Sequence, residues 1–107
     1  MTINLETIKH PITRSLIEAL QNGDVTTWQS LFAKDAKLFD DGNPRDLRQF
    51  TTDALGHERF TSIDKVTDHG LSVTGKFHTE QWGDFVTYFK LTLNDANKIT
   101  RLDIGQA

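Results

Sequence analysis

The spacing of apolar residues changes halfway along the chain, and this change constrains the fold most strongly. In the first half, apolar residues recur three and four positions apart, as with Ile12, Leu16 and Leu20 in residues 11–22. In the second half they alternate with polar residues, as in residues 71–79. Helical stretches followed by a series of strands indicate an α+β domain, because alternating βα units would mix the two spacings.

The first two helices carry clear signals at their ends. Pro11 suits the first position of a helix over residues 11–22, because the N–H that proline lacks is not needed there. Gly23 follows as a left-handed C-terminal cap, and Asp24 follows as the N-cap of a second, shorter helix. Trp28 lies on the apolar face of this second helix.

A short strand and a third helix are predicted next. Residues 37–40 read as a strand. We expect Asn43 to cap a third helix, with Pro44 at its first position and Gly56 at its end. Phe50 lies on the apolar stripe of this helix.

The rest of the chain reads as strands joined by short turns. With segregated helices, this predicts a curved antiparallel sheet wrapped around the N-terminal helices, with one face covered and a cavity between the layers. We expect a single domain over residues 1–107. The expected strands occupy residues 57–67, 71–79, 85–93 and 98–106.

Composition narrows the possible functions. The net charge is −3 and the basic residues are scattered, so nucleic acid is not an expected partner. The absence of cysteine excludes disulfides and makes the cytoplasm the expected compartment. No apolar run is long enough to cross a membrane. His78 and Glu80 share a strand face without a third ligand at a telling spacing, so we expect neither a metal nor another cofactor.

Two segments resemble the nuclear transport factor 2-like (NTF2-like) superfamily, which includes ketosteroid isomerases, SnoaL-like polyketide cyclases and dehydratases. Residues 19–42, "ALQNGDVTTWQSLFAKDAKLFDDG", resemble the opening of that fold, and residues 94–106, "NDANKITRLDIGQ", resemble its closing hairpin. The order of elements agrees as well. The resemblance implies a cone-shaped, cystatin-like α+β roll. It does not select one function, because the fold hosts enzymes, carriers and interaction modules.

The resemblance also implies a general base. In the isomerases this base is an aspartate at the end of the first strand, five residues after the Asp-Ala step, which corresponds to Asp40 here. Strand alternation places Asp40 on the same face as Leu38. The two oxyanion donors of the isomerases have no counterpart, since Leu16 stands at the tyrosine position and residues 85–93 contain no acid.

Each candidate residue has two interpretations. Asp40 either faces a pocket or belongs to a solvated turn with Asp41. Trp28 fits the core as well as a cavity wall. Phe60, Phe77 and Phe89 are also candidates to line an apolar ligand site, and His57 is placed near its mouth.

Two functions therefore remain open. One is an isomerase-, cyclase- or dehydratase-type enzyme that uses Asp40 on an apolar, carbonyl-containing ligand. The other is a non-catalytic binding or interaction module whose cone is filled by side chains. In either case the resemblance implies a homodimer through the outer face of the sheet, where Tyr88 and Lys90 are expected.

Overall fold

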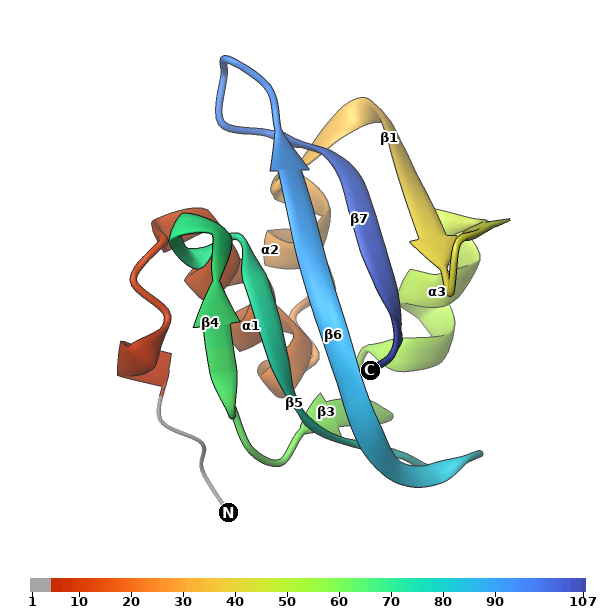
Figure 1. Ribbon diagram of the computed structural model, residues 1–107. Helices are drawn as coiled ribbons and strands as arrows, with labels where there is room; N and C mark the ends of the chain where they lie inside the picture. The colour runs from red at the N-terminus through yellow and green to blue at the C-terminus, as the bar shows by residue number, and fades with distance from the viewer. Residues whose placement is uncertain (1–4) are drawn as a thin grey trace.

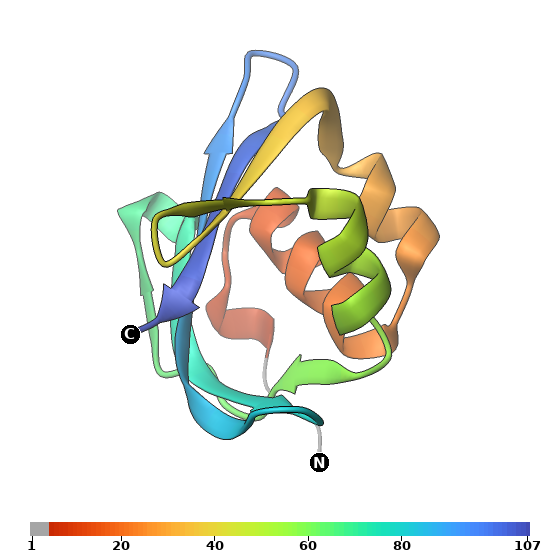
Figure 2. The same cartoon turned by 90° about the vertical axis from the view of Figure 1, so that its right-hand side faces the viewer.

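The computed structural model describes residues 5–107 and shows an α+β architecture. Within these residues, three α-helices gather on one side of a curved, seven-stranded sheet (Figures 1 and 2). The predicted single domain over residues 1–107 includes residues 1–4, which lie outside the described part. None of the described helices has the length and apolar composition needed to span a bilayer.

The elements follow the order expected for helices first and strands later. The helices are α1 (Pro11–Asn22), α2 (Val25–Ser30) and α3 (Leu47–Ala54), with short 3₁₀ turns at Leu5–Thr7 and Asp68–Gly70. The strands are β1 (Phe32–Asp40), β2 (Asn43–Arg45), β3 (Glu58–Phe60), β4 (Lys65–Thr67), β5 (Ser72–Thr79), β6 (Gly83–Leu93) and β7 (Ile99–Gln106).

The sheet is mixed rather than wholly antiparallel. Its order is β2-β1-β7-β6-β5-β3, with β4 also paired to β5. All pairs are antiparallel except β1 with β7, which run parallel. After β1 the chain passes through β2, α3 and strands β3 to β6, and its last strand, β7, lies beside β1. A parallel neighbour requires such a long crossover.

The ends of α1 and α2 confirm the capping predictions. His10 is extended and its Nδ1 accepts a hydrogen bond from the Ile12 N–H at 3.2 Å. Gly23 closes α1 in the left-handed conformation, with φ of 65°. Asp24 caps α2 by accepting a hydrogen bond from the Thr27 N–H at 3.1 Å, and its carboxylate also accepts one from the Thr27 hydroxyl. The hydroxyl bond, and to a smaller extent the N–H bond, lowers the pKa of Asp24.

The predicted start of the third helix is wrong. Asn43 and Pro44 belong to β2, which pairs with β1, and α3 begins only at Leu47 with Asp46 as its cap. Asp41 and Gly42 both have positive φ, 51° and 85°, as a type I′ two-residue hairpin requires. This tight turn folds the chain straight back onto β1. The first strand is also longer than predicted, because it begins at Phe32, which pairs with Ile99 of β7.

The core lies between the concave face of the sheet and the helices. Leu16, Ile17 and Leu20 of α1 are fully buried against Phe60 and Val73 of the sheet. Alternation along β5 and β6 places Val73, Phe77, Phe89 and Leu91 on this inner face, as the sequence predicts.

The outer face of the sheet carries the residues of the predicted dimer interface. Arg101 lies over the ring of Phe39, with its guanidinium carbon 4.0 Å from the ring centroid, and pairs with Asp103 at 3.0 Å. Tyr88 and Lys90 occupy the neighbouring strand β6. Homodimerisation through this face stays a prediction.

Candidate functional site

A cavity of about 810 Å³ opens between the concave face of the sheet, the β1–β2 hairpin and the C-terminal end of α3. Both aromatic and charged side chains contribute to its walls. The residues that line it are Asp40, Asp41, Arg45, Phe50, Thr52, Asp53, His57, Glu58, Phe77, Thr79, Glu80, Gln81, Trp82, Asp84, Phe85, Thr87, Phe89, Ile104, Gly105 and Gln106.

Asp40 reaches this cavity from the last position of β1. Leu38, two residues earlier, is buried on the same face, so alternation turns the Asp40 side chain inward. Arg45 on β2 donates to Asp40 Oδ2 at 2.8 Å, and both side chains are about one third exposed. No other described residue donates to Asp40, so Oδ1 remains free to act on a ligand.

The β1–β2 hairpin is held in place by strand β7. The Asp41 N–H donates to the Ile104 carbonyl at 2.9 Å, and Asp41 Oδ1 accepts from the Gln106 N–H at 3.1 Å. Asp41 therefore uses its carboxylate to fix the hairpin. Its neighbour Asp40 is left to face the cavity.

The apolar wall consists of aromatic side chains on β5 and β6. Phe77 and Phe89 have ring centroids 5.9 Å apart, and Phe85 lies 6.1 Å from Phe77. Phe60 sits behind them, with edge-on contacts of 5.0 Å and 5.2 Å to Phe77 and Phe89. These tilted and edge-on contacts hold the wall rigid.

Glu58 enters the same cavity from β3. On this short strand Glu58 shares a face with the buried Phe60. Strand β3 pairs with β5 on one edge, and on the other edge the Gln21 side chain of α1 bonds both the N–H and the carbonyl of Phe60, at 2.7 Å and 2.8 Å. This bidentate contact fixes the position of Glu58.

Burial changes the acidity of Glu58. The loss of water around its carboxyl raises the pKa of Glu58 above the ordinary value, and the nearby Asp53 and Asp40 act in the same direction. Arg45 and His57 oppose this rise without cancelling it. Glu58 forms no hydrogen bond or ion pair with the described residues, so its carboxyl is free to contact a ligand.

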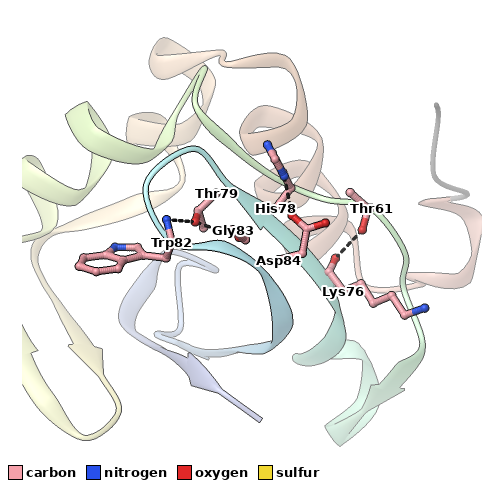
Figure 3. Close-up of polar contacts among 7 residues, drawn as sticks. All are labelled: Thr61, Lys76, His78, Thr79, Trp82, Gly83 and Asp84. Atoms are coloured by element: carbon pink, nitrogen blue, oxygen red, sulfur yellow. Dashed lines mark hydrogen bonds and ion pairs between the residues drawn. The ribbon is translucent and has the colours of Figure 1, made fainter.

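The β5–β6 turn, drawn in Figure 3, contributes Glu80, Gln81 and Trp82 to the lining of the cavity. The Thr79 hydroxyl accepts from the Trp82 N–H at 2.8 Å and donates to the Gly83 carbonyl at 3.0 Å. His78 and Asp84 pair across the turn at 2.6 Å. The Trp82 ring projects away from the turn in Figure 3 and is 72% exposed, so this aromatic group is available at the mouth.

Four of the six predicted site residues line this cavity, namely Asp40, Phe77, Phe89 and His57. His57 lies at the mouth, where its Nδ1 is 2.9 Å from Glu80 Oε1.

Trp28 and Phe60 lie elsewhere. Trp28 is fully buried and its indole N–H donates to Thr51 Oγ1 at 2.9 Å. It is one of the residues that line a second hollow of about 660 Å³ between β1 and the second and third helices. Phe60 is core packing behind the aromatic wall. Among the described residues, no three acidic or histidine side chains are grouped as metal ligands.

Sequence reasoning missed Glu58 and Arg45. A signal for Glu58 exists, because a glutamate two residues before an inward phenylalanine shares its face if the segment is a strand. Arg45 was hidden by the wrong assignment of the third helix. The Asp41-Gly42 pair was the available signal, since Asp-Gly favours a two-residue hairpin that brings Arg45 back beside Asp40.

Glu58 predicts a specific pH dependence of stability. Because its folded pKa is raised, the folded state binds this proton more tightly than the unfolded state. The resulting stabilisation is complete below the ordinary value of 4.5 and is lost as the pH rises through the folded pKa. The unfolding free energy of the wild type relative to Glu58→Gln should therefore fall with rising pH, as measured by urea unfolding.

A matched control separates this effect from general charge loss. Glu18→Gln removes an exposed carboxylate on α1, outside the cavity, and should show a constant difference from the wild type. A difference for Glu58→Gln that stayed flat or rose with pH would contradict burial as the cause.

No protein-family model matches this chain, and a comparison with curated proteins finds no significant match.

Solved structures share the fold at low identity. A candidate polyketide cyclase from Sinorhizobium meliloti has 19% identity and a TM-score of 0.74, over 94% of this chain and 98% of that one. An NTF2-like protein of unknown function from Cytophaga hutchinsonii has 12% identity and a TM-score of 0.71, over 100% and 93%.

An orange carotenoid protein from Anabaena (Nostoc), solved with canthaxanthin bound, has 20% identity and a TM-score of 0.71. The match covers 91% of this chain but 35% of the carotenoid protein, so the chain spans about a third of that protein's length. Other similar structures are described as having a cystatin-like fold. The chain therefore has the NTF2-like, cystatin-like α+β fold that SnoaL-like cyclases share.

Proposed function

We propose that this protein binds a small molecule with an apolar body in the cavity and uses Asp40 as a general base next to a carbonyl group. The observation that carries the proposal is the open, aromatic-walled cavity of about 810 Å³ with the free Asp40 Oδ1 at its edge. The lining combines aromatic side chains with polar and charged groups, and ligand sites favour such concave spaces with convergent polar groups.

The distribution of packing in the cone supports binding over the filled-cone alternative. The part of the cone beneath α1 is filled by Leu16, Ile17, Leu20 and Phe60, all essentially buried. The part beneath the β1–β2 hairpin is open. A purely structural module has no need to leave this half empty, because filling it would add apolar burial.

The groups around Asp40 fit proton transfer. Arg45 orients the carboxylate through Oδ2, and Oδ1 is free to take a proton from a carbon next to a carbonyl. The Arg45 guanidinium lies 4.9 Å from the centroid of the Phe50 ring, which restrains it. A positioned cation beside the base also favours the negative charge that develops on the carbonyl oxygen.

The comparison structures are consistent with this class of ligand. One is a candidate polyketide cyclase and another holds canthaxanthin, an apolar molecule. We extend the proposal to a homodimer that pairs the outer sheet faces around Phe39 and Arg101, and to a cytoplasmic location.

A thermal-shift screen of small apolar carbonyl compounds tests binding. A ligand at ten times its Kd is expected to stabilise the native state by about 1.4 kcal/mol. For a domain of this size that corresponds to a rise in Tm of about 5 °C or more. The rise should saturate with concentration and be absent for polyols of equal size. A screen in which no apolar compound raises Tm would support the non-catalytic interaction module instead.

A further inference from the structure

The charges that line the cavity are strongly unbalanced. Six acidic residues line it, with one arginine and one histidine as the basic lining residues. The chain as a whole carries 12 basic and 15 acidic side chains, so this imbalance is much greater than the average. The acidic lining residues are Asp40, Asp41, Asp53, Glu58, Glu80 and Asp84.

The arginine and the histidine of the lining already have acidic partners. Arg45 pairs with Asp40 at 2.8 Å, and His57 lies 2.9 Å from Glu80. Neither Arg45 nor His57 forms a hydrogen bond or ion pair with Glu58, whose carboxyl has no such partner among the described residues. Loss of water raises the pKa of Glu58, and Asp53 and Asp40 act in the same direction, so the opposing influence of Arg45 and His57 only partly offsets its negative charge.

Aromatic rings surround the same space. Phe77, Phe85 and Phe89 form one wall, and the exposed ring of Trp82 stands at the mouth. The face of an aromatic ring attracts a cation that lies within about 6 Å of its centroid. Rings combined with an acidic lining, in which the Glu58 carboxyl accepts no hydrogen bond from the described residues, form a site that favours positive charge and also covers apolar groups.

We propose that the ligand of this cavity is an organic cation, whose charged nitrogen lies beside Glu58 and whose apolar body lies against Phe77, Phe85 and Phe89. This inference rests on the proposed function and names its ligand class. A cationic nitrogen supplies the counter-charge that Glu58 lacks. An anionic ligand would face six carboxylates at close range, which the arrangement disfavours.

The second hollow provides an internal contrast. Basic residues outnumber acidic ones in its lining, so its charge balance is opposite to that of the cavity. The charged lining residues are Lys34, Lys37, Arg45, Arg48 and Asp46. Both spaces have apolar walls, so the difference in charge is what should direct an organic cation to the cavity rather than to the second hollow.

A matched pair of probes tests the inference. Benzyltrimethylammonium and neopentylbenzene have nearly the same shape and differ in charge. We expect the cation to bind the wild-type protein about tenfold more tightly in calorimetric titration at pH 8 and low salt. Added salt should weaken binding of the cation and leave binding of the neutral probe unchanged, because dissolved ions screen only the charged interaction.

Two variants locate the cation. Glu58→Gln keeps the shape of the side chain and should lower the affinity for the cation about tenfold, while the affinity for the neutral probe should change by no more than about twofold. Glu18→Gln removes the same charge from the exposed face of α1 and should leave both affinities unchanged. An equal loss of affinity for the cation in both variants would overturn the assignment of the charged nitrogen to Glu58.

The outcomes separate this inference from the proposed function. Binding of neopentylbenzene without a preference for the cation would overturn the inference and leave an apolar site intact. Binding of neither probe would overturn both. Tighter binding of the cation, lost in Glu58→Gln, would support both.

Discussion

Replacement of Trp28 by alanine is expected to lower the free energy of unfolding by about 3–5 kcal/mol, the range for a large aromatic residue removed from a core. Trp28 is fully buried and its ring lies 5.4 Å from Phe32 and 6.2 Å from Phe50. It thereby joins α2 to β1 and α3. The Thr51 hydroxyl also donates to the Leu47 carbonyl at 2.9 Å, so the variant leaves Thr51 with one partner, and most of the loss comes from packing.

Denaturant unfolding measures this loss, and the second tryptophan supplies a matched control. Trp82 is 72% exposed at the β5–β6 turn, so Trp82→Ala should change stability by no more than about 0.5 kcal/mol. A loss below about 1 kcal/mol for Trp28→Ala would show that α2 does not depend on this residue. Equal losses in the two variants would contradict the burial difference on which the prediction rests.

Replacement of Asp40 by asparagine is expected to slow proton abstraction by roughly 10²–10⁴-fold, the usual contribution of a general base. Asparagine keeps the shape of the side chain but cannot accept the proton. The fold should survive, because the Asp40–Arg45 pair is about one third exposed and pairs of this kind contribute about 1 kcal/mol or less.

The rate can be followed before the natural reaction is known. A base that removes a proton next to a carbonyl also catalyses exchange of that proton with deuterium from the solvent, which NMR detects on any ligand found by the thermal-shift screen. Asp35→Asn, on the exposed side of the same strand, is the matched control and should keep the wild-type rate. Undiminished exchange in Asp40→Asn would exclude Asp40 as the base.

Local signals predicted most of the fold. Pro11, Gly23 and Asp24 act only on their own neighbours, so their effects follow from sequence, and the bounds of α1 agree with the prediction. Alternation in β5 and β6 likewise follows from local geometry. The start of α3 was mispredicted because Asn43 and Pro44 are compatible with both a helix start and an edge strand.

The candidate site was only half predictable. The inward direction of Asp40 followed from its position two residues after Leu38, which is a property of one strand. The neighbours of Asp40 come from other segments. Arg45 arrives through the hairpin, and Glu58 arrives on β3 because Gln21 of α1 holds that strand edge.

By itself, the sequence determined the order of helices and strands, the inner face of each strand and the aspartate at the end of the first one. These properties depend on residues within a few positions of one another. Only the tertiary structure decided that β7 returns parallel to β1, that the mouth of the cone stays open, and that an unpaired Glu58 lies among aromatic rings. Those features depend on the register between distant strands, and no local spacing of residues encodes that register.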